Sequence, residues 1–148
     1  MPRLDNSIDI SAPADIVFQY VADIRRYPEW VKWAKEAEWT SNEEALGVGS
    51  TFTMRMQVGP RKEWVEGIVT EFIAGELITK RHTRGMQLTD RLSVLTVGEA
   101  TKVAWSVEYT PPMGKLGQMG DVIFMSRLFN QLAEDSLAIL KERLERTP

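Results

Sequence analysis

The chain has 148 residues, 18 basic and 21 acidic, for a net charge of −3, with no cysteine and one histidine. Its length suits one domain, so we expect a single domain over 1–148. The lack of cysteine excludes disulfides and iron–sulfur clusters, and one histidine excludes multi-histidine metal sites. The acidic balance argues against a general nucleic-acid binder. With no signal peptide and no apolar run of about 18 residues, the expected location is the cytoplasm.

The N-terminal part is predicted to hold one strand followed by two short helices. Residues 4–10 form the strand. Ser11 is expected to cap the first helix, and Asp15 complements the positive end of its dipole. Apolar residues then recur at helical spacing, at Ile16, Val17, Tyr20 and Val21. A second short helix is expected over 26–33, because Pro28 fits only in a first turn.

Beyond Trp39 the apolar period changes from that of a helix to that of a strand. Apolar and polar residues alternate over 51–58, which predicts a half-buried strand. Further strand-like runs lie at 62–73, 76–84, 86–97 and 100–110, separated by the turn signals Gly59-Pro60, Ala74-Gly75, Arg84-Gly85 and Gly98-Glu99. These connections are too short for crossover helices, so the strands are expected to form an antiparallel meander.

A long helix is predicted over 119–145. One stripe of this helix, mostly apolar, carries Met125, Leu128, Phe129, Leu132, Ser136, Leu140 and Leu144. At about 1.5 Å per residue the helix is about 40 Å long. The stretch 113–120 contains three glycines and is expected to act as a mobile lid. The order of elements predicts an α+β fold, in which a curved antiparallel sheet of six to seven strands wraps the helix and leaves a binding cleft.

Several segments resemble one superfamily of known proteins. They are SAPADIVF at 11–18, VADI at 21–24, YPEW at 27–30, TKV at 101–103, YTPP at 109–112, LAED at 132–135 and LKERLE at 140–145. The chain resembles START-like (Bet v 1-like, SRPBCC) domains, and among these the polyketide cyclase/dehydrase family. The resemblance implies a helix-grip fold with a cavity for hydrophobic ligand binding or lipid transport. That family includes carriers, receptors and cyclases without a shared catalytic signature, so the fold does not settle the activity.

Strand pairing predicts which side chains face the cleft. A two-residue turn at Gly98-Glu99 sets the inward pairs Val94–Val103, Leu92–Trp105, Asp90–Val107 and Leu88–Tyr109. A similar turn at Gly85-Met86 would place Arg81 opposite Asp90 on the inner face and His82 on the outer face. The Arg81–Asp90 pair is interpreted either as a structural salt bridge or as a polar anchor for a ligand carbonyl, carboxylate or phenol.

The facing of the strand at 62–73 is open to two interpretations. Counting across Ala74-Gly75 places Trp64 and Glu66 inward, and this is the preferred assignment. Counting from the strand at 51–58 places Val65, Gly67 and Val69 inward instead. A longer turn or a β-bulge would reconcile the two counts.

Candidate site residues follow from the predicted inner wall and its mouth. The candidate ligand-binding residues are Trp30, Phe52, Met54, Met56, Trp64, Arg81, Leu88, Asp90, Leu92, Trp105, Val107, Tyr109, Met125 and Phe129. For an enzyme, the catalytic candidates are Tyr109, Asp90 or Glu66 as acid or base, with Arg81 stabilising an enolate oxygen. No cofactor and no metal are expected.

Three functions fit these features. The first is a binding or carrier protein for an apolar small molecule such as a lipid, a quinone or an aromatic polyketide. The second is a cyclase or dehydratase that acts on a polyketide-like substrate by acid–base chemistry. The third is an interaction module like the Hsp90 activators, which share the architecture. We expect an apolar small-molecule partner, no nucleic acid, no integral membrane segment, and a monomer or a homodimer.

Overall fold

The computed structural model describes residues 2–111 and 119–146, with side chains from 123 onward in the second range. Its strands are β1 (Arg3–Ile10), β2 (Ala34–Trp39), β3 (Thr51–Val58), β4 (Arg61–Ile73), β5 (Leu77–Arg84), β6 (Leu88–Val97) and β7 (Ala100–Tyr109). Its helices are α1 (Ala14–Ala22), α2 (Tyr27–Trp30) and α3 (Met119–Arg146), with the short 3-10 turns η1 (Ile24–Arg26) and η2 (Glu43–Ala45).

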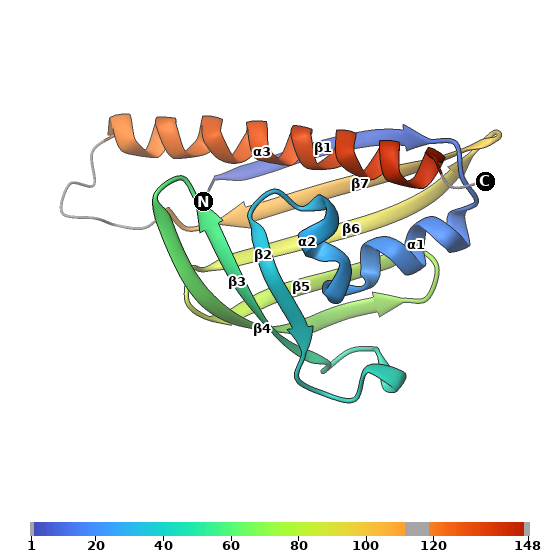
Figure 1. Cartoon of the computed structure of the whole chain (residues 1–148), viewed down its shortest axis with the longest axis horizontal. Helices are drawn as coiled ribbons and strands as arrows, with labels where there is room; N and C mark the ends of the chain where they lie inside the picture. The colour runs from blue at the N-terminus through green and yellow to red at the C-terminus, as the bar shows by residue number, and fades with distance from the viewer. Residues whose placement is uncertain (1, 112–118, 147–148) are drawn as a thin grey trace.

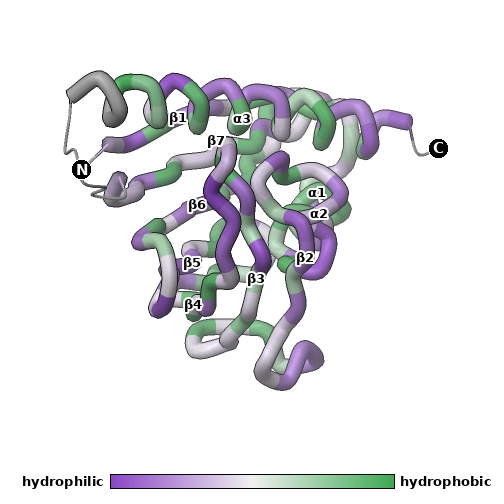
Figure 2. The backbone as a smooth tube through the Cα atoms, turned by 60° about the vertical axis from the view of Figure 1, so that its left-hand side comes forward, coloured by the Kyte–Doolittle hydropathy of each residue, from purple (hydrophilic) through white to green (hydrophobic). Residues whose placement is uncertain are grey.

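The described strands form one curled antiparallel sheet in the order β1-β7-β6-β5-β4-β3-β2 (Figure 1). The long helix α3 runs beside β1, and α1 and α2 lie against the sheet between α3 and β2 (Figure 1). Hydrophilic and hydrophobic positions follow one another along α3 and along several strands (Figure 2). The α+β helix-grip fold is thereby confirmed. Strand β2 has no counterpart among the predicted strands, because its apolar residues do not alternate.

Helix α1 begins at Ala14 without the expected side-chain cap. Its N-cap residue is Pro13, which makes no side-chain capping hydrogen bond, so the prediction that Ser11 caps this helix is wrong. The backbone N–H of Ser11 instead donates a hydrogen bond to Glu145 Oε2 on α3 at 2.8 Å. This contact ties the connection between β1 and α1 to the C-terminal end of α3.

Strand β4 presents Val65, Gly67 and Val69 to the core, whereas Trp64 and Glu66 face solvent. The side of Trp64 is unambiguous, because this residue is 55% exposed. The preferred inward assignment of Trp64 and Glu66 is therefore wrong, and the alternative count from the preceding strand is right. The reason is that this assignment is counted from β5: Ile68 does lie opposite Arg81, as the count requires, but Arg81 faces solvent instead of the core.

Strand β5 is one residue out of step with the prediction. Lys80, rather than Arg81, lies opposite Asp90. Lys80 and His82 are buried and Arg81 is exposed, so the predicted inward side of Arg81 and outward side of His82 are both wrong. The connection from β5 to β6 is longer than the assumed two-residue turn. A slip of one residue moves every side chain of a strand to the other face.

The pairing of β6 with β7 follows the predicted register. Asp90 lies opposite Val107, and Val97 lies opposite Ala100 across the turn. On α3 the predicted stripe is turned toward the sheet, with Phe129, Ser136, Leu140 and Leu144 buried and Met125, Leu128 and Leu132 partly buried. The predicted lid at 113–120 lies largely outside the described residues.

Gly67 is expected to be intolerant of any side chain. It lies opposite Phe52 in the β3–β4 ladder, and a Cβ atom there would overlap the ring of Phe52. Gly67→Ala should therefore lower the free energy of unfolding by about 1–3 kcal/mol, since the ring must leave a packed position. Urea denaturation followed by tryptophan fluorescence measures this change.

The matched control is Gly47→Ala. No atom lies within 4 Å of a Cβ at Gly47, so the expected change is within about 0.5 kcal/mol. Equal losses in the two variants would show that Phe52 does not restrict Gly67.

Candidate functional site

Five buried aromatic residues join the sheet to α3. Trp30 and Trp33 come from α2 and the segment that follows it, Trp105 and Tyr109 from β7, and Phe129 from α3. The ring centroids of Trp30 and Trp33 are each 5.1 Å from that of Trp105. The ring of Phe129 lies 5.0 Å from Trp33 and 4.6 Å from Tyr109. We call these five residues the aromatic cluster; they hold α3 against the inner face of the sheet.

Little empty space remains beside the aromatic cluster. The void next to it, which we call the interior void, has a volume of about 10 Å³ and is lined by Ile24, Tyr27, Trp33, Phe52, Met54, Lys80, His82, Leu88 and Asp90. This is roughly the room for one water molecule. Ligand pockets usually measure about 300–1,000 Å³. The roomy cleft expected between sheet and helix is thus absent from the described part of the chain, and a ligand of that size requires side chains to move.

Three polar side chains converge on the carboxylate of Asp90, which borders the interior void together with Tyr27 and Lys80. Tyr27 donates its hydroxyl hydrogen to Asp90 Oδ2 at 2.9 Å, and Trp105 Nε1 donates to the same oxygen at 3.2 Å. Lys80 Nζ lies 3.4 Å from the other oxygen, Oδ1. We call Tyr27, Lys80, Asp90 and Trp105 the polar centre. The buried ion pair expected at Asp90 therefore exists, but its cation is Lys80 and not Arg81.

The amine of Lys80 has unused hydrogen-bonding capacity. Its side chain is 1% exposed, and within the described residues Nζ makes no hydrogen bond of good geometry. Besides Asp90, it contacts the face of the Tyr27 ring, 4.9 Å from the ring centroid. Burial lowers the pKa of Lys80 below its ordinary value, although the Asp90 carboxylate opposes this shift. Burial, and then the charge of Asp90, raise the pKa of Tyr27 well above its ordinary value.

His82 lies on the same wall of the interior void as Lys80. It is 3% exposed, which corrects its predicted place on the solvent side. Its Nδ1 lies 2.8 Å from the carbonyl oxygen of Met86 in the connection between β5 and β6. Since a carbonyl only accepts hydrogen bonds, Nδ1 carries the proton and Nε2 is left as an acceptor. Burial lowers the pKa of His82 below its ordinary value.

The buried histidine predicts a loss of stability in mild acid. Below pH 6.5, the ordinary histidine pKa, the unfolded chain binds a proton that folded His82, with its lowered pKa, does not bind. The free energy of unfolding should therefore fall as the pH falls from 6.5 toward the pKa of folded His82. Thermal denaturation across this range tests the effect, and NMR can follow the imidazole without overlap because the chain has one histidine. His82→Gln keeps a donor for Met86 and should reduce the dependence of the free energy of unfolding on pH. If this dependence is unchanged in the variant, other groups cause it.

Most of the predicted ligand-binding residues are gathered on the inner wall. The buried ones are Trp30, Phe52, Met54, Met56, Leu88, Asp90, Leu92, Trp105, Val107, Tyr109 and Phe129, and Met125 is partly buried. Trp64, Arg81 and Glu66 lie on the solvent side and do not reach the polar centre. The sequence interpretation missed Lys80 in this role. The apolar residue Ile78 could have indicated this role. If Ile78 faces the core, then Lys80 and His82 also face the core, because side chains two residues apart on a strand share a face.

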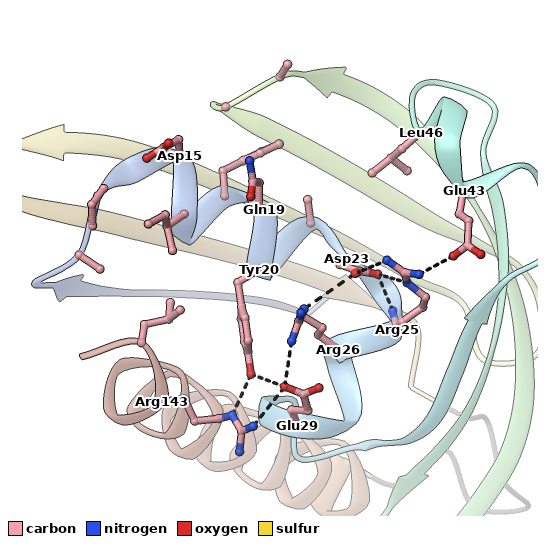
Figure 3. Close-up of a pocket in the computed structure, with 18 of the residues that line it drawn as sticks. Asp15, Gln19, Tyr20, Asp23, Arg25, Arg26, Glu29, Glu43, Leu46 and Arg143 are labelled. Atoms are coloured by element: carbon pink, nitrogen blue, oxygen red, sulfur yellow. Dashed lines mark hydrogen bonds and ion pairs between the residues drawn. The ribbon is translucent and has the colours of Figure 1, made fainter. Parts of the chain in front are cut away.

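A much larger groove runs along α1, from the C-terminal end of α3 on one side to Glu43 and Leu46 on the other (Figure 3). Its volume is about 1360 Å³, and its walls include Phe18, Trp39, Leu46 and Phe72. We call it the outer groove. It is two orders of magnitude larger than the interior void, but it does not contain the polar centre.

Six charged residues of the outer groove are joined with Tyr20 in one chain of contacts (Figure 3). Arg143 donates to the Tyr20 hydroxyl at 2.8 Å and to Glu29 at 3.2 Å. From there the chain continues through the ion pairs Arg26–Glu29, Arg26–Asp23, Arg25–Asp23 and Arg25–Glu43. The outer groove thus has ample volume, but most of its charges are already paired. In the interior, by contrast, the amine of Lys80 lies in apolar surroundings and has no hydrogen bond of good geometry in the described structure. We therefore place the candidate site at the polar centre.

The described residues provide neither a cluster of metal ligands nor a membrane-spanning helix. No group of three or more histidine and acidic side chains there is arranged to hold a metal ion. No helix in the described part has the length and apolar character needed to cross a membrane.

Comparison with curated proteins finds no match. Among solved structures, the chain is similar to a START superfamily protein from Mycobacterium smegmatis, with 14% identity, a TM-score of 0.79 and 100% of both chains covered. It is also similar to the Zhui aromatase/cyclase from Streptomyces sp. R1128, with 12% identity, a TM-score of 0.80, and 97% and 93% of the chains covered. The Aha1 dimer from Colwellia psychrerythraea is similar at 19% identity and a TM-score of 0.64, over 98% and 97% of the chains.

These structural likenesses concern the fold, since sequence identity is low. A family model described as polyketide cyclase / dehydrase and lipid transport matches residues 1–145. That match includes every strand of the curled sheet and nearly all of α3. The chain therefore belongs to the polyketide cyclase/dehydrase and lipid transport family, and it has the START-like fold.

Proposed function

We propose that the protein binds an apolar small molecule between the sheet and α3, with one hydrogen-bond acceptor of the ligand at Lys80. The observation that carries this proposal is the buried amine of Lys80, which borders the interior void and has no hydrogen bond of good geometry in the described structure. The family of the chain, whose description includes both cyclases and lipid transport, supports the same ligand class.

The energetics of the polar centre favour a role beyond folding. Burying an ammonium and a carboxylate costs several kcal/mol per ion, and a well-packed apolar pair often stabilises a fold equally well. Asp90 recovers part of this cost through its bonds from Tyr27 and Trp105. Lys80 recovers less, because its shortest polar contact is 3.4 Å. A ligand oxygen at Nζ would supply the missing acceptor, as the few polar groups of an apolar pocket commonly do.

Room for the ligand must come from the aromatic cluster. Trp33 and Phe129 contact each other across the gap between the α2–β2 segment and α3, and Trp33 also lines the interior void. Rotation of these rings away from the sheet would join the void to the surface of α3. Pockets of this kind are minor conformations that a ligand makes dominant.

Displacement of a fluorescent apolar probe tests the proposal. A straight-chain alkane, ketone and carboxylic acid of equal length are compared as competitors. All three should displace the probe, and the ketone should act at roughly two- to tenfold lower concentration than the alkane, because one added hydrogen bond contributes about 0.5–1.5 kcal/mol.

Two variants locate the site. Lys80→Met should remove the advantage of the ketone, whereas Arg143→Gln in the outer groove should leave it unchanged. Circular dichroism checks that each variant is folded. The comparison of the three competitors on the wild-type protein does not depend on either variant. Failure of all three competitors would refute the proposal, and loss of displacement in Arg143→Gln would move the site to the outer groove.

A second candidate function is acid–base turnover of a polyketide-like substrate. It is favoured by the enclosure of titratable groups at the polar centre, with Asp90 and Tyr27 2.9 Å apart and His82 on the same void. The position of Glu66 and Arg81 on the solvent side removes these two from the catalytic candidates. If turnover occurs, Asp90→Asn should abolish it and Arg81→Ala should keep the wild-type rate. Loss of activity in Arg81→Ala would contradict this assignment.

A further inference from the structure

We propose that Lys80 forms a reversible protonated imine with an apolar aldehyde or ketone bound at the polar centre. This inference rests on the proposed function, because the carbonyl compound must first enter the space between the sheet and α3. It goes further by assigning a covalent step to the amine and by naming the ligand class.

The surroundings of Nζ resemble those that an imine-forming lysine requires. A nucleophilic lysine is typically desolvated in an apolar pocket. Lys80 is 1% exposed and borders a void whose other walls include Phe52, Met54 and Leu88. Burial lowers the pKa of Lys80, which raises the fraction of neutral amine at neutral pH.

Asp90 is placed to act as counter-ion before and after the reaction. Its Oδ2 accepts hydrogen bonds from Tyr27 at 2.9 Å and from Trp105 at 3.2 Å, so the carboxylate is held in place. Its Oδ1 faces Lys80 Nζ at 3.4 Å. An ammonium and a protonated imine carry the same positive charge on the same nitrogen. The ion pair with Asp90 is therefore preserved when one replaces the other.

The step balances in atoms and charge. The neutral amine attacks the carbonyl carbon, a C–N bond forms, and the carbonyl oxygen leaves as water. Overall, one ammonium and one carbonyl compound give one protonated imine and one water. The proton that the ammonium gives up before attack needs an acceptor near the void. His82 lines the same void, and its Nε2 is left as an acceptor by the Nδ1 bond to Met86.

Reductive trapping tests the proposal on the wild-type protein. The chain is incubated with a long-chain aldehyde and cyanoborohydride near neutral pH, and peptide mass spectrometry locates the alkylated lysines. Lys80 should be modified about tenfold faster than the exposed Lys32, Lys35 and Lys102, despite its burial, because a desolvated amine is the better nucleophile. Modification of Lys80 no faster than these surface lysines would overturn the proposal.

The alcohol of the same chain length separates the two proposals, because it can bind but cannot form an imine. Probe displacement by the alcohol together with slow labelling of Lys80 would leave binding intact and reject the imine. No displacement and no labelling would reject both. Lys80→Arg keeps a cation beside Asp90 and should lose the interior adduct, whereas the matched control Lys102→Arg, at an exposed position of β7, should keep it.

Discussion

Asp90→Asn should lower the free energy of unfolding by about 3–5 kcal/mol, the usual cost of breaking a buried ion pair from one side. The asparagine oxygen can still accept from Tyr27 and Trp105, but the ammonium of Lys80 loses its counter-charge 3.4 Å away. Urea denaturation measures the loss. In this variant the free energy of unfolding should rise as the pH rises toward 10.5, the ordinary lysine pKa. The pKa of folded Lys80 is lowered, so over this range the unfolded chain holds a proton on Lys80 that the folded chain has released.

An exposed ion pair and a double variant serve as controls for Asp90→Asn. Glu36→Gln breaks the exposed pair with Arg55, 2.7 Å apart, and should cost at most about 1 kcal/mol. Asp90→Asn combined with Lys80→Met removes both buried charges and should recover much of the loss, because no unpaired ion remains. A cost for Asp90→Asn as small as that for Glu36→Gln would contradict the buried ion pair.

Phe129→Ala should cost about 3–5 kcal/mol and at the same time create a binding cavity. The ring of Phe129 is fully buried and packs on Trp33 and Tyr109. Its removal leaves space bordered by the aromatic cluster, where we place the ligand. Apolar engineered cavities stay dry and bind small apolar molecules. Benzene should therefore raise the thermal midpoint of the variant more than that of the wild type, in which Phe129 and Trp33 must first move apart.

Phe124→Ala on the same helix is the matched control. Phe124 is 65% exposed, so its truncation should change stability by no more than about 0.5 kcal/mol and create no cavity. If Phe124→Ala costs as much as Phe129→Ala, the packing of α3 against the sheet differs from that described above.

The sequence was sufficient for the order of elements except β2, and for one of the hairpins in full. Gly98-Glu99 is a true two-residue turn, so the pairing of β6 with β7 and the inward side of Asp90, Trp105 and Tyr109 could be predicted. Hydrophobic periodicity likewise located β3 and α3, because each has one buried face. These signals are local, and they remain valid without any knowledge of distant contacts.

The identity of the lysine at the polar centre could not be predicted in the same way. Lys80, Arg81, His82 and Arg84 are all polar or charged, so β5 lacks an alternation that marks its inner face. Its facing depends on the length of the connection between β5 and β6, and no residue type there indicates that length. The volume of the interior was also beyond prediction, because it depends on how closely Phe129 and Trp33 approach once α3 docks.

The far edge of the sheet has a consequence for the behaviour of the protein at high concentration. In the strand order, β2 has a neighbouring strand on one side only, so it forms an edge of the sheet. Such an edge can recruit a strand from another molecule and start aggregation. Here the pairing of β2 is interrupted by a register shift between Ala34 and Glu36, and Lys35, Glu36 and Glu38 are exposed. Irregularity and charge together make this edge a poor template for intermolecular strand addition.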